Sequence, residues 1–167
     1  AMSLENRAAF FFVWLAINKL GAIAGFMNTY IQGKPLTHSL DVTNAKFVVV
    51  GEECAALYAA TEGLPALHYL HWPDADRPAG PQVLGQFGPD LEQLAQTQST
   101  SNGPTQWREG VTGGDTAQYI FTSGTTGLPK AAVVSHARWL MTGEAMQVLW
   151  EIDQTDRFYC FLPMYHA

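Results

Sequence analysis

Apolar and polar positions follow one another in blocks that predict helices alternating with short buried strands. The first block, 8–27, contains only two polar side chains, Asn18 and Lys19. We predict a helix over 5–19, a break at the following glycine and a strand over 22–26. A membrane span is not expected, because a lysine near the centre of a bilayer costs about 2.5–3.5 kcal/mol.

The same alternation continues in most of the remaining chain. Residues 46–51 form an apolar, β-branched run that ends in glycine, which is typical of a strand buried on both faces. Ser135 is a good N-cap for an amphipathic helix that follows it. The other predicted helices are 35–44, 52–61, 90–96 and 136–150, and the other predicted strands are 66–72, 117–122, 131–134 and 157–162. Helices between continuous apolar strands indicate an α/β protein with a parallel sheet.

Residues 73–116 interrupt this alternation. Five of the nine prolines lie there, among many Gly, Gln, Ser and Thr residues. We expect a long and variable surface connection. It separates the helix and strand units of 1–72 from a C-terminal segment over 117–167.

Composition narrows the class of protein. The chain has 167 residues, of which 47% are hydrophobic and 14% charged, enough for one globular domain without disulfides. A net charge of −6 excludes a protein that coats nucleic acid. Cys54 and Cys160 lie too far apart for a zinc ribbon and indicate a reducing compartment, and we expect both to be small buried side chains.

Several residues that could carry chemistry are expected to be structural. His68 and His71 would face opposite sides of a strand, so they cannot share a metal ion, and we assign no metal ligand. His38 is expected to cap or pack rather than to contact a substrate. Ser123 lacks the G-x-S-x-G context of a nucleophile elbow, so a serine hydrolase is not expected.

The segment between the predicted strands 117–122 and 131–134 is rich in glycine and hydroxyl groups. Glycines let backbone N–H groups turn into a concavity that holds an anion, hydroxyls add donors, and a lysine adds one positive charge. The candidate phosphate-binding residues are Thr122, Ser123, Gly124, Thr125, Thr126, Gly127 and Lys130. A Walker P-loop does not fit, because Ala131 stands where its Ser or Thr would be. Composition alone leaves open a plain hairpin turn with a solvated lysine.

The order of residues in this segment adds a resemblance. Residues 119–130, Y-I-F-T-S-G-T-T-G-L-P-K, closely resemble the signature of the adenylate-forming superfamily, the AMP-binding enzymes. Residues 161–166, F-L-P-M-Y-H, are similar to that family's aromatic–histidine segment at the acyl pocket. Residues 5–14 and 33–40 are similar to the fatty acid transport protein and very-long-chain acyl-CoA synthetase branch. The resemblance spans nearly the whole chain and is weak across 73–116.

The resemblance implies a layered αβαβα-type N-terminal domain with a mostly parallel sheet, of which 1–167 is an incomplete part. It implies that a long- or very-long-chain fatty acid reacts with ATP·Mg²⁺ to give an acyl-adenylate, and that coenzyme A then displaces AMP. The glycine–threonine loop would hold the β- and γ-phosphates. Tyr165 and His166 would line the acyl and adenylate pocket.

The resemblance also implies what lies elsewhere. The family's adenine-binding segment with its acidic magnesium ligand, its ribose-binding aspartate, its hinge and its catalytic lysine are expected beyond Ala167. We therefore assign no catalytic residue here and expect a fragment that is inactive as a ligase by itself. Ala131 replaces a glycine that is usual in the family, a change that the acyl-transport branch tolerates.

Two other functions stay open. One is a non-catalytic, truncated module of the same fold that binds lipid or a protein partner. The other is an adenylating ligase for a different carboxylate, of the coumarate or carnitine type. We expect a cytoplasmic location or one at the cytoplasmic face of a membrane, with peripheral association left open.

Overall fold

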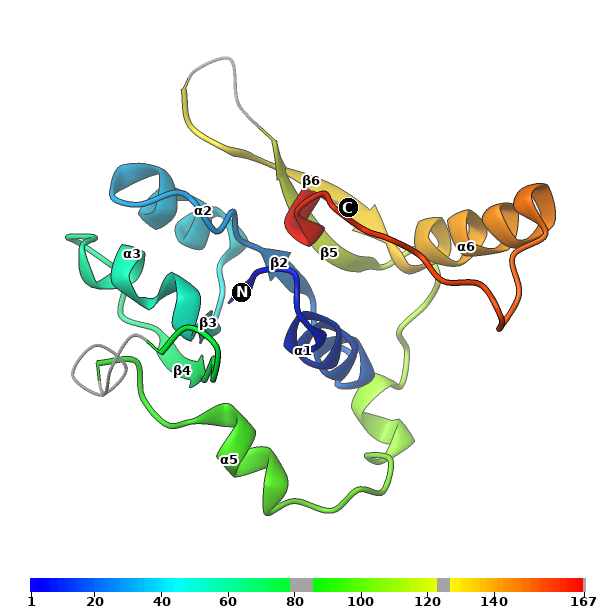
Figure 1. Cartoon of the computed structure of the whole chain (residues 1–167), viewed down its shortest axis with the longest axis horizontal. Helices are drawn as coiled ribbons and strands as arrows, with labels where there is room; N and C mark the ends of the chain where they lie inside the picture. Colours follow the sequence, from blue (N-terminus) through cyan, green and yellow to red (C-terminus); the bar gives the residue numbers. More distant parts are fainter. Residues whose placement is uncertain (79–85, 123–126, 167) are drawn as a thin grey trace.

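A six-stranded sheet organises the chain in the computed structural model, which describes residues 1–78, 86–122 and 127–166 (Figure 1). The strand order is β4-β3-β1-β2-β5-β6. The strands are β1 Met2–Ser3, β2 Ala24–Phe26, β3 Phe47–Gly51, β4 His68–Trp72, β5 Thr116–Thr122 and β6 Lys130–Ser135. Neighbours among β1 to β5 pair in parallel, and β6 pairs antiparallel with β5. The prediction of an α/β protein with a mostly parallel sheet is confirmed.

The helices form close to where the sequence predicts them. The α-helices are α1 Ala8–Lys19, α2 Lys34–Thr43, α3 Ala55–Ala59, α5 Leu91–Gln96 and α6 His136–Trp150, and the 3₁₀ turns are η1 Glu52–Cys54, η2 Thr105–Arg108 and η3 Met164–His166. Gly21 follows α1 with a φ of +71°, and a Cβ there would lie 2.8 Å from the Trp107 carbonyl oxygen, so glycine is required. None of the described helices has both the length and the apolar character that a bilayer crossing requires.

Buried side chains form two clusters. One includes Phe10 of α1 together with Phe26 and Val49. The other includes Leu40 of α2 and Tyr58 of α3 together with neighbouring valines of β3. Because successive residues of β3 enter different clusters, this strand is buried on both faces, as its apolar run predicts.

Strand β1 was not predicted, although it lies near the middle of the sheet. It consists only of Met2–Ser3, too short for any periodic pattern. Its position is set by neighbours that are distant in sequence, since the Met27 N–H donates to the Met2 carbonyl oxygen at 2.9 Å.

The predicted strand over 157–162 is wrong. These residues have no regular structure, and the side chains of Phe158, Tyr159 and Phe161 are exposed. A strand needs a partner for its backbone groups, and none of the described strands lies beside this segment. The expectation that Cys160 is buried is wrong for the same reason, whereas Cys54 is buried as expected.

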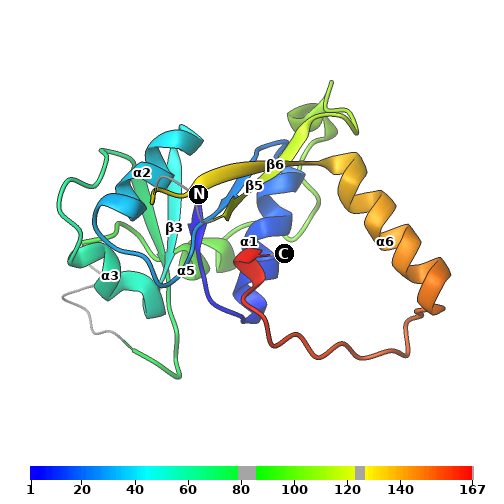
Figure 2. The same cartoon turned by 90° about the horizontal axis from the view of Figure 1, so that it is seen from above.

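Helix α6 lies where its sequence predicts, but it does not behave as a packed amphipathic helix. The Ser135 hydroxyl accepts a hydrogen bond from the Arg138 N–H at 3.3 Å, which confirms the predicted N-cap. None of the residues of α6 is buried, and the helix projects away from the other helices (Figure 2). Most of the predicted apolar face is therefore exposed, although Trp139 packs against Trp14 of α1.

Candidate functional site: the β5–β6 loop and the η3 segment

The predicted phosphate loop connects the ends of β5 and β6. Thr122, the last residue of β5, pairs with Lys130, the first residue of β6. The Thr122 hydroxyl donates to the Lys130 carbonyl oxygen at 3.5 Å, so both residues are held at the mouth of the loop. Of the predicted phosphate-binding residues, Ser123, Gly124, Thr125 and Thr126 lie outside the described residues.

The described part of the loop has features that suit an anion. Gly127 has a φ of +82°, the left-handed region that glycine adopts without strain. The Lys130 side chain is exposed and makes no ion pair with any residue in the described ranges. A lysine whose charge is not neutralised can contribute that charge to a phosphate group.

A histidine fixes the exit of this loop. His38 of α2 donates from Nε2 to the Pro129 carbonyl oxygen at 3.1 Å, across 91 positions of sequence. This contact is the packing role that the sequence favoured for His38. It attaches the segment just before Lys130 to the helix layer on that side of the sheet.

The aromatic–histidine segment forms the short turn η3, which packs against β5. The Tyr165 ring is 6% exposed and belongs to the same buried cluster as Ile120 of β5. Burial is the main cause that raises the pKa of Tyr165. His166 is exposed, and its ring centroid lies 4.5 Å from that of Tyr165. Two segments predicted to serve one site are therefore attached to the same strand.

Asn6 holds this segment in place, a role that the sequence did not indicate. Its Nδ2 donates to the Leu162 carbonyl oxygen at 2.8 Å, and its Oδ1 accepts from the Met164 N–H at 2.8 Å. These two bonds span 156 and 158 positions of sequence. No local pattern marks an amide whose partners are so remote, although the resemblance in 5–14 includes it.

A buried ion pair fixes the chain just after Asn6. Arg7 pairs with Glu53 at 2.7 Å, and the side chain of Glu53 is only 1% exposed. Arg7 also donates to the carbonyl oxygens of Pro73 and Trp72 at 2.6 and 3.1 Å. These contacts join the start of α1 to the carboxyl end of β4 and set the position from which Asn6 reaches Leu162.

The histidines of β4 make packing and backbone contacts. His68 stacks on Phe47 with ring centroids 5.1 Å apart, and His71 Nδ1 lies 3.0 Å from the Gly88 carbonyl oxygen. The described ranges contain no cluster of three or more His, Cys, Asp or Glu side chains that could hold a metal ion.

The fold is that of the N-terminal domains of adenylate-forming enzymes. The inhibitor-bound N-terminal domain of FACL13 from Mycobacterium tuberculosis matches with a TM-score of 0.69 at 23% identity, covering 98% of this chain and 38% of that one. The o-succinylbenzoate coenzyme A synthetase of Bacillus subtilis, in complex with ATP and magnesium ion, matches with a TM-score of 0.64 at 18% identity, covering 98% of this chain and 29% of that one.

The sequence model of the family "AMP-binding enzyme" matches residues 1–167, and the chain belongs to this family. It is 33% identical over 168 residues to long-chain fatty acid transport protein 1 of Bos taurus, covering 100% of this chain. It is 34% identical over 170 residues to the medium/long-chain-fatty-acid–CoA ligase FadD6 of Mycobacterium tuberculosis, covering 98% of this chain. The chain spans 25% of the length of each of these two relatives.

Proposed function

We propose that the chain is part of the N-terminal domain of an AMP-forming acid–thiol ligase that activates long- or very-long-chain fatty acids. The acid's carboxylate attacks the α-phosphate of ATP, a new acyl–phosphate bond forms, and the α–β bridging bond breaks to release pyrophosphate. The thiolate of coenzyme A then attacks the acyl carbonyl, and AMP leaves. The observation that carries this proposal is the twelve-residue signature at 119–130, located on the β5–β6 pair of the family's fold.

In this proposal the β5–β6 loop binds the β- and γ-phosphates of ATP. The left-handed Gly127 leaves room for close approach, since a Cβ at this position would have no atom of the described structure within 4 Å. Lys130 supplies the positive charge and Thr122 a hydroxyl at the mouth of the loop. Charge that develops on departing pyrophosphate is stabilised by such fixed donors and cations.

The metal ion would bind mainly to the triphosphate itself and neutralise part of its charge. The part of the chain that the structure describes offers no acidic cluster for it. We therefore assign this chain to phosphate binding and assign no magnesium ligand within it.

Asn6 and η3 would form the acyl side of the same site. Tyr165 is buried in the core beside β5, which fixes the position of its backbone. The His166 ring packs against the Tyr165 ring and is therefore also held beside β5. His166 is exposed, so in this proposal it offers the substrate a polar contact beside the apolar side chains of the η3 segment. Asn6 is a positioning residue for the η3 segment, because it forms hydrogen bonds with the backbone on either side of Pro163.

The experiment is ATP–pyrophosphate exchange in a longer polypeptide that carries this segment. Replacing Lys130 by alanine should lower fatty-acid-dependent exchange by about 10²-fold, with little change in the affinity for the acid. Lys46→Ala is the matched control, because Lys46 is exposed and lies just before β3. Exchange that is equal in Lys130→Ala and Lys46→Ala would contradict the phosphate role of the loop.

The carboxylate specificity is tested in the same assay. We expect exchange with long-chain fatty acids to exceed exchange with 4-coumarate or carnitine, and a reversed order would replace the fatty acid by another substrate class. The chain by itself should form no thioester, since the expected catalytic lysine is not assigned within 1–167. Thioester formation by the chain alone would overturn that part of the proposal.

A further inference from the structure

Lys130 begins the strand at the edge of the sheet, so few neighbours determine its position. Of the strands that the structure describes, only β5 pairs with β6. An edge strand has one row of interstrand hydrogen bonds where a central strand has two. Contacts from outside the sheet therefore matter more for Lys130 than for a residue of a central strand.

One such contact holds the peptide group between Pro129 and Lys130. Proline has no N–H, so the carbonyl oxygen is the single hydrogen-bonding group of the Pro129 backbone. This oxygen lies 3.1 Å from Nε2 of His38. A carbonyl oxygen can only accept, so Nε2 carries the proton and donates. Because a peptide group is planar, holding its oxygen sets the direction from which the chain enters the Cα of Lys130.

The peptide group on the other side of Lys130 is held by β5. Thr122 is the pairing partner of Lys130, and its hydroxyl donates to the Lys130 carbonyl oxygen at 3.5 Å. A residue has only two soft backbone dihedrals, φ and ψ, and they relate the two adjoining peptide planes. With both planes held, the direction of the Lys130 Cα–Cβ bond is fixed. His38 controls one of the two planes.

His38 is itself on a firmly held helix. Leu36 and Leu40 of α2 are each 1% exposed and belong to the same buried cluster as Phe121 of β5. Ala131, the residue after Lys130, also packs against this cluster. The half-buried His38 ring therefore reaches Pro129 from a helix that the core fixes relative to β5 and β6.

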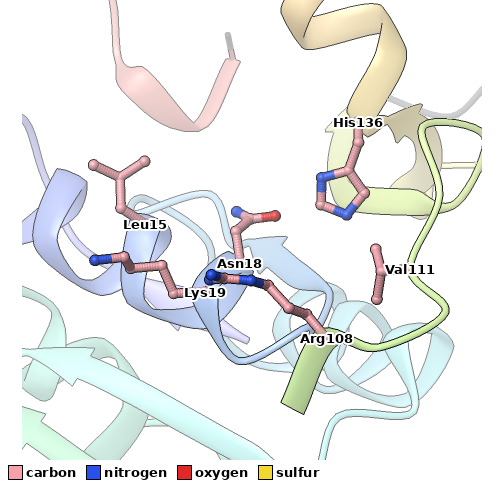
Figure 3. A pocket seen from close by; sticks show the side chains of 6 residues that line it. All are labelled: Leu15, Asn18, Lys19, Arg108, Val111 and His136. Atoms are coloured by element: carbon pink, nitrogen blue, oxygen red, sulfur yellow. The ribbon is translucent and has the colours of Figure 1, made fainter. Parts of the chain in front are cut away.

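The opposite end of β6 also carries a histidine, which provides a comparison. There the His136 and Ala137 N–H groups donate to the Asp115 and Gly113 carbonyl oxygens at 3.1 and 2.7 Å. The His136 side chain lines a cavity of about 440 Å³ between the start of α6 and the last turns of α1 (Figure 3). A strand of the length of β6 spans about 20 Å at about 3.3 Å per residue. His136 is therefore too far from Lys130 to position it.

We propose that His38 is a positioning residue that directs Lys130 toward the phosphates of ATP. This inference rests on the phosphate role proposed above for Lys130. His38 acts through the Pro129 carbonyl oxygen and does not contact the nucleotide. A lysine side chain loses rotamer freedom when it binds, and a fixed backbone reduces the further ordering that binding requires. Loss of the His38 contact should therefore weaken ATP binding and leave binding of the fatty acid unchanged.

The test is the KM for each substrate in ATP–pyrophosphate exchange, measured in the longer polypeptide. His38→Phe removes the donor and should raise the KM for ATP about three- to tenfold, as expected for one lost hydrogen bond, with the KM for the fatty acid unchanged. His38→Gln keeps an N–H donor and should restore most of the ATP affinity. His136→Phe is the matched control and should change neither KM. An unchanged KM for ATP in His38→Phe, or an equal rise in His136→Phe, would overturn the proposal.

A double-mutant cycle separates positioning from a general effect on the fold. In a Lys130→Ala background, His38→Phe should cause no further loss, because the side chain that it directs is absent. Additive losses would contradict the proposal. Unchanged exchange in Lys130→Ala alone would refute the phosphate role itself, whereas a loss in Lys130→Ala with none in His38→Phe would refute only the role of His38.

Circular dichroism establishes whether each variant folds. If His38→Phe does not fold, His38→Ala removes the same contact without a larger ring, and the same rise in the KM for ATP alone is expected. Unfolding of both variants would overturn the proposal, because His38 would then be required by the fold as a whole.

Discussion

Helix α1, near the N-terminus, and helix α6, near the C-terminus, differ greatly in how much of their surface is buried. Helix α1 packs Phe10 and Val13 into a cluster with Phe26, whose side chain is 0% exposed. Helix α6 is longer, yet its Leu149 and Val148 are 75% and 76% exposed. Both helices are rich in apolar side chains, and only α6 has a side-chain N-cap, so the difference in burial lies in what faces them.

The two helices contact each other through a pair of tryptophans. The indole rings of Trp14 on α1 and Trp139 on α6 lie with centroids 5.0 Å apart. Helix α6 is also held by its Ser135 cap and by its first two residues, because the His136 and Ala137 N–H groups donate to the Asp115 and Gly113 carbonyl oxygens at 3.1 and 2.7 Å. The later turns of α6 depend on their own backbone hydrogen bonds. Isolated helices of this length are marginal in water, so α6 should be much less stable than α1. The comparison shows that local sequence signals define a helix, while tertiary cover decides how firmly it is held.

Truncating a buried ring that packs against α1 should cost far more stability than truncating an exposed side chain of α6. Phe26→Ala should lower the free energy of unfolding by about 3–5 kcal/mol, because it leaves a cavity between α1 and the sheet. Leu149→Ala, its matched control on α6, should change it by no more than about 0.5 kcal/mol. Urea unfolding followed by circular dichroism measures both. Similar losses would mean that α6 is covered in solution.

Alkaline pH should destabilise the buried cluster that contains Cys54 and Tyr58. Burial raises the pKa of the Cys54 thiol and of the Tyr58 hydroxyl, so the folded state keeps protons that the unfolded state releases. The contribution of these two groups to the free energy of unfolding is therefore fully present below their unfolded pKa values. It falls as the pH rises above about 9, by up to about 1.4 kcal/mol per pH unit for each group. Urea midpoints measured across this range should fall less steeply in Cys54→Ala. An unchanged slope would rule out Cys54 as a source.

Asn6→Ala should loosen the η3 segment without unfolding the sheet. The loss of two hydrogen bonds should lower local protection at Met164 by about 1–3 kcal/mol. Hydrogen exchange read by mass spectrometry measures this, and Asn102→Ala on the exposed connection is the control. If Met164 exchanges at the same rate in both variants, Asn6 does not position η3.

The smallest effect concerns the cap of α6. Ser135→Ala should destabilise the first turn of α6 by about 1 kcal/mol, because the Arg138 N–H loses its partner. Exchange in α6 should rise, while the urea midpoint of the whole chain should stay the same. A shifted midpoint would show that α6 unfolds together with the sheet and is not a separate element.

Local signals in the sequence determined most elements and the family. The apolar run before Gly51, the glycine after α1 and the serine before α6 act on neighbouring residues, so each predicts its own helix or strand correctly. The signature at 119–130 likewise consists of adjacent residues. The strands β5 and β6, which contain its two ends, form where predicted, because short apolar runs on either side of a glycine-rich turn favour paired strands.

Features that depend on partners remote in sequence arise only in the folded chain. Two residues of β1 become a central strand because β2 and β3 pair with them. Residues 157–162 have strand-like composition but remain irregular, since no described strand offers them a partner. Asn6 gains its role from a segment 156 positions away. Burial and hydrogen bonding across the fold are properties of pairs of segments, so neither segment's sequence contains them alone.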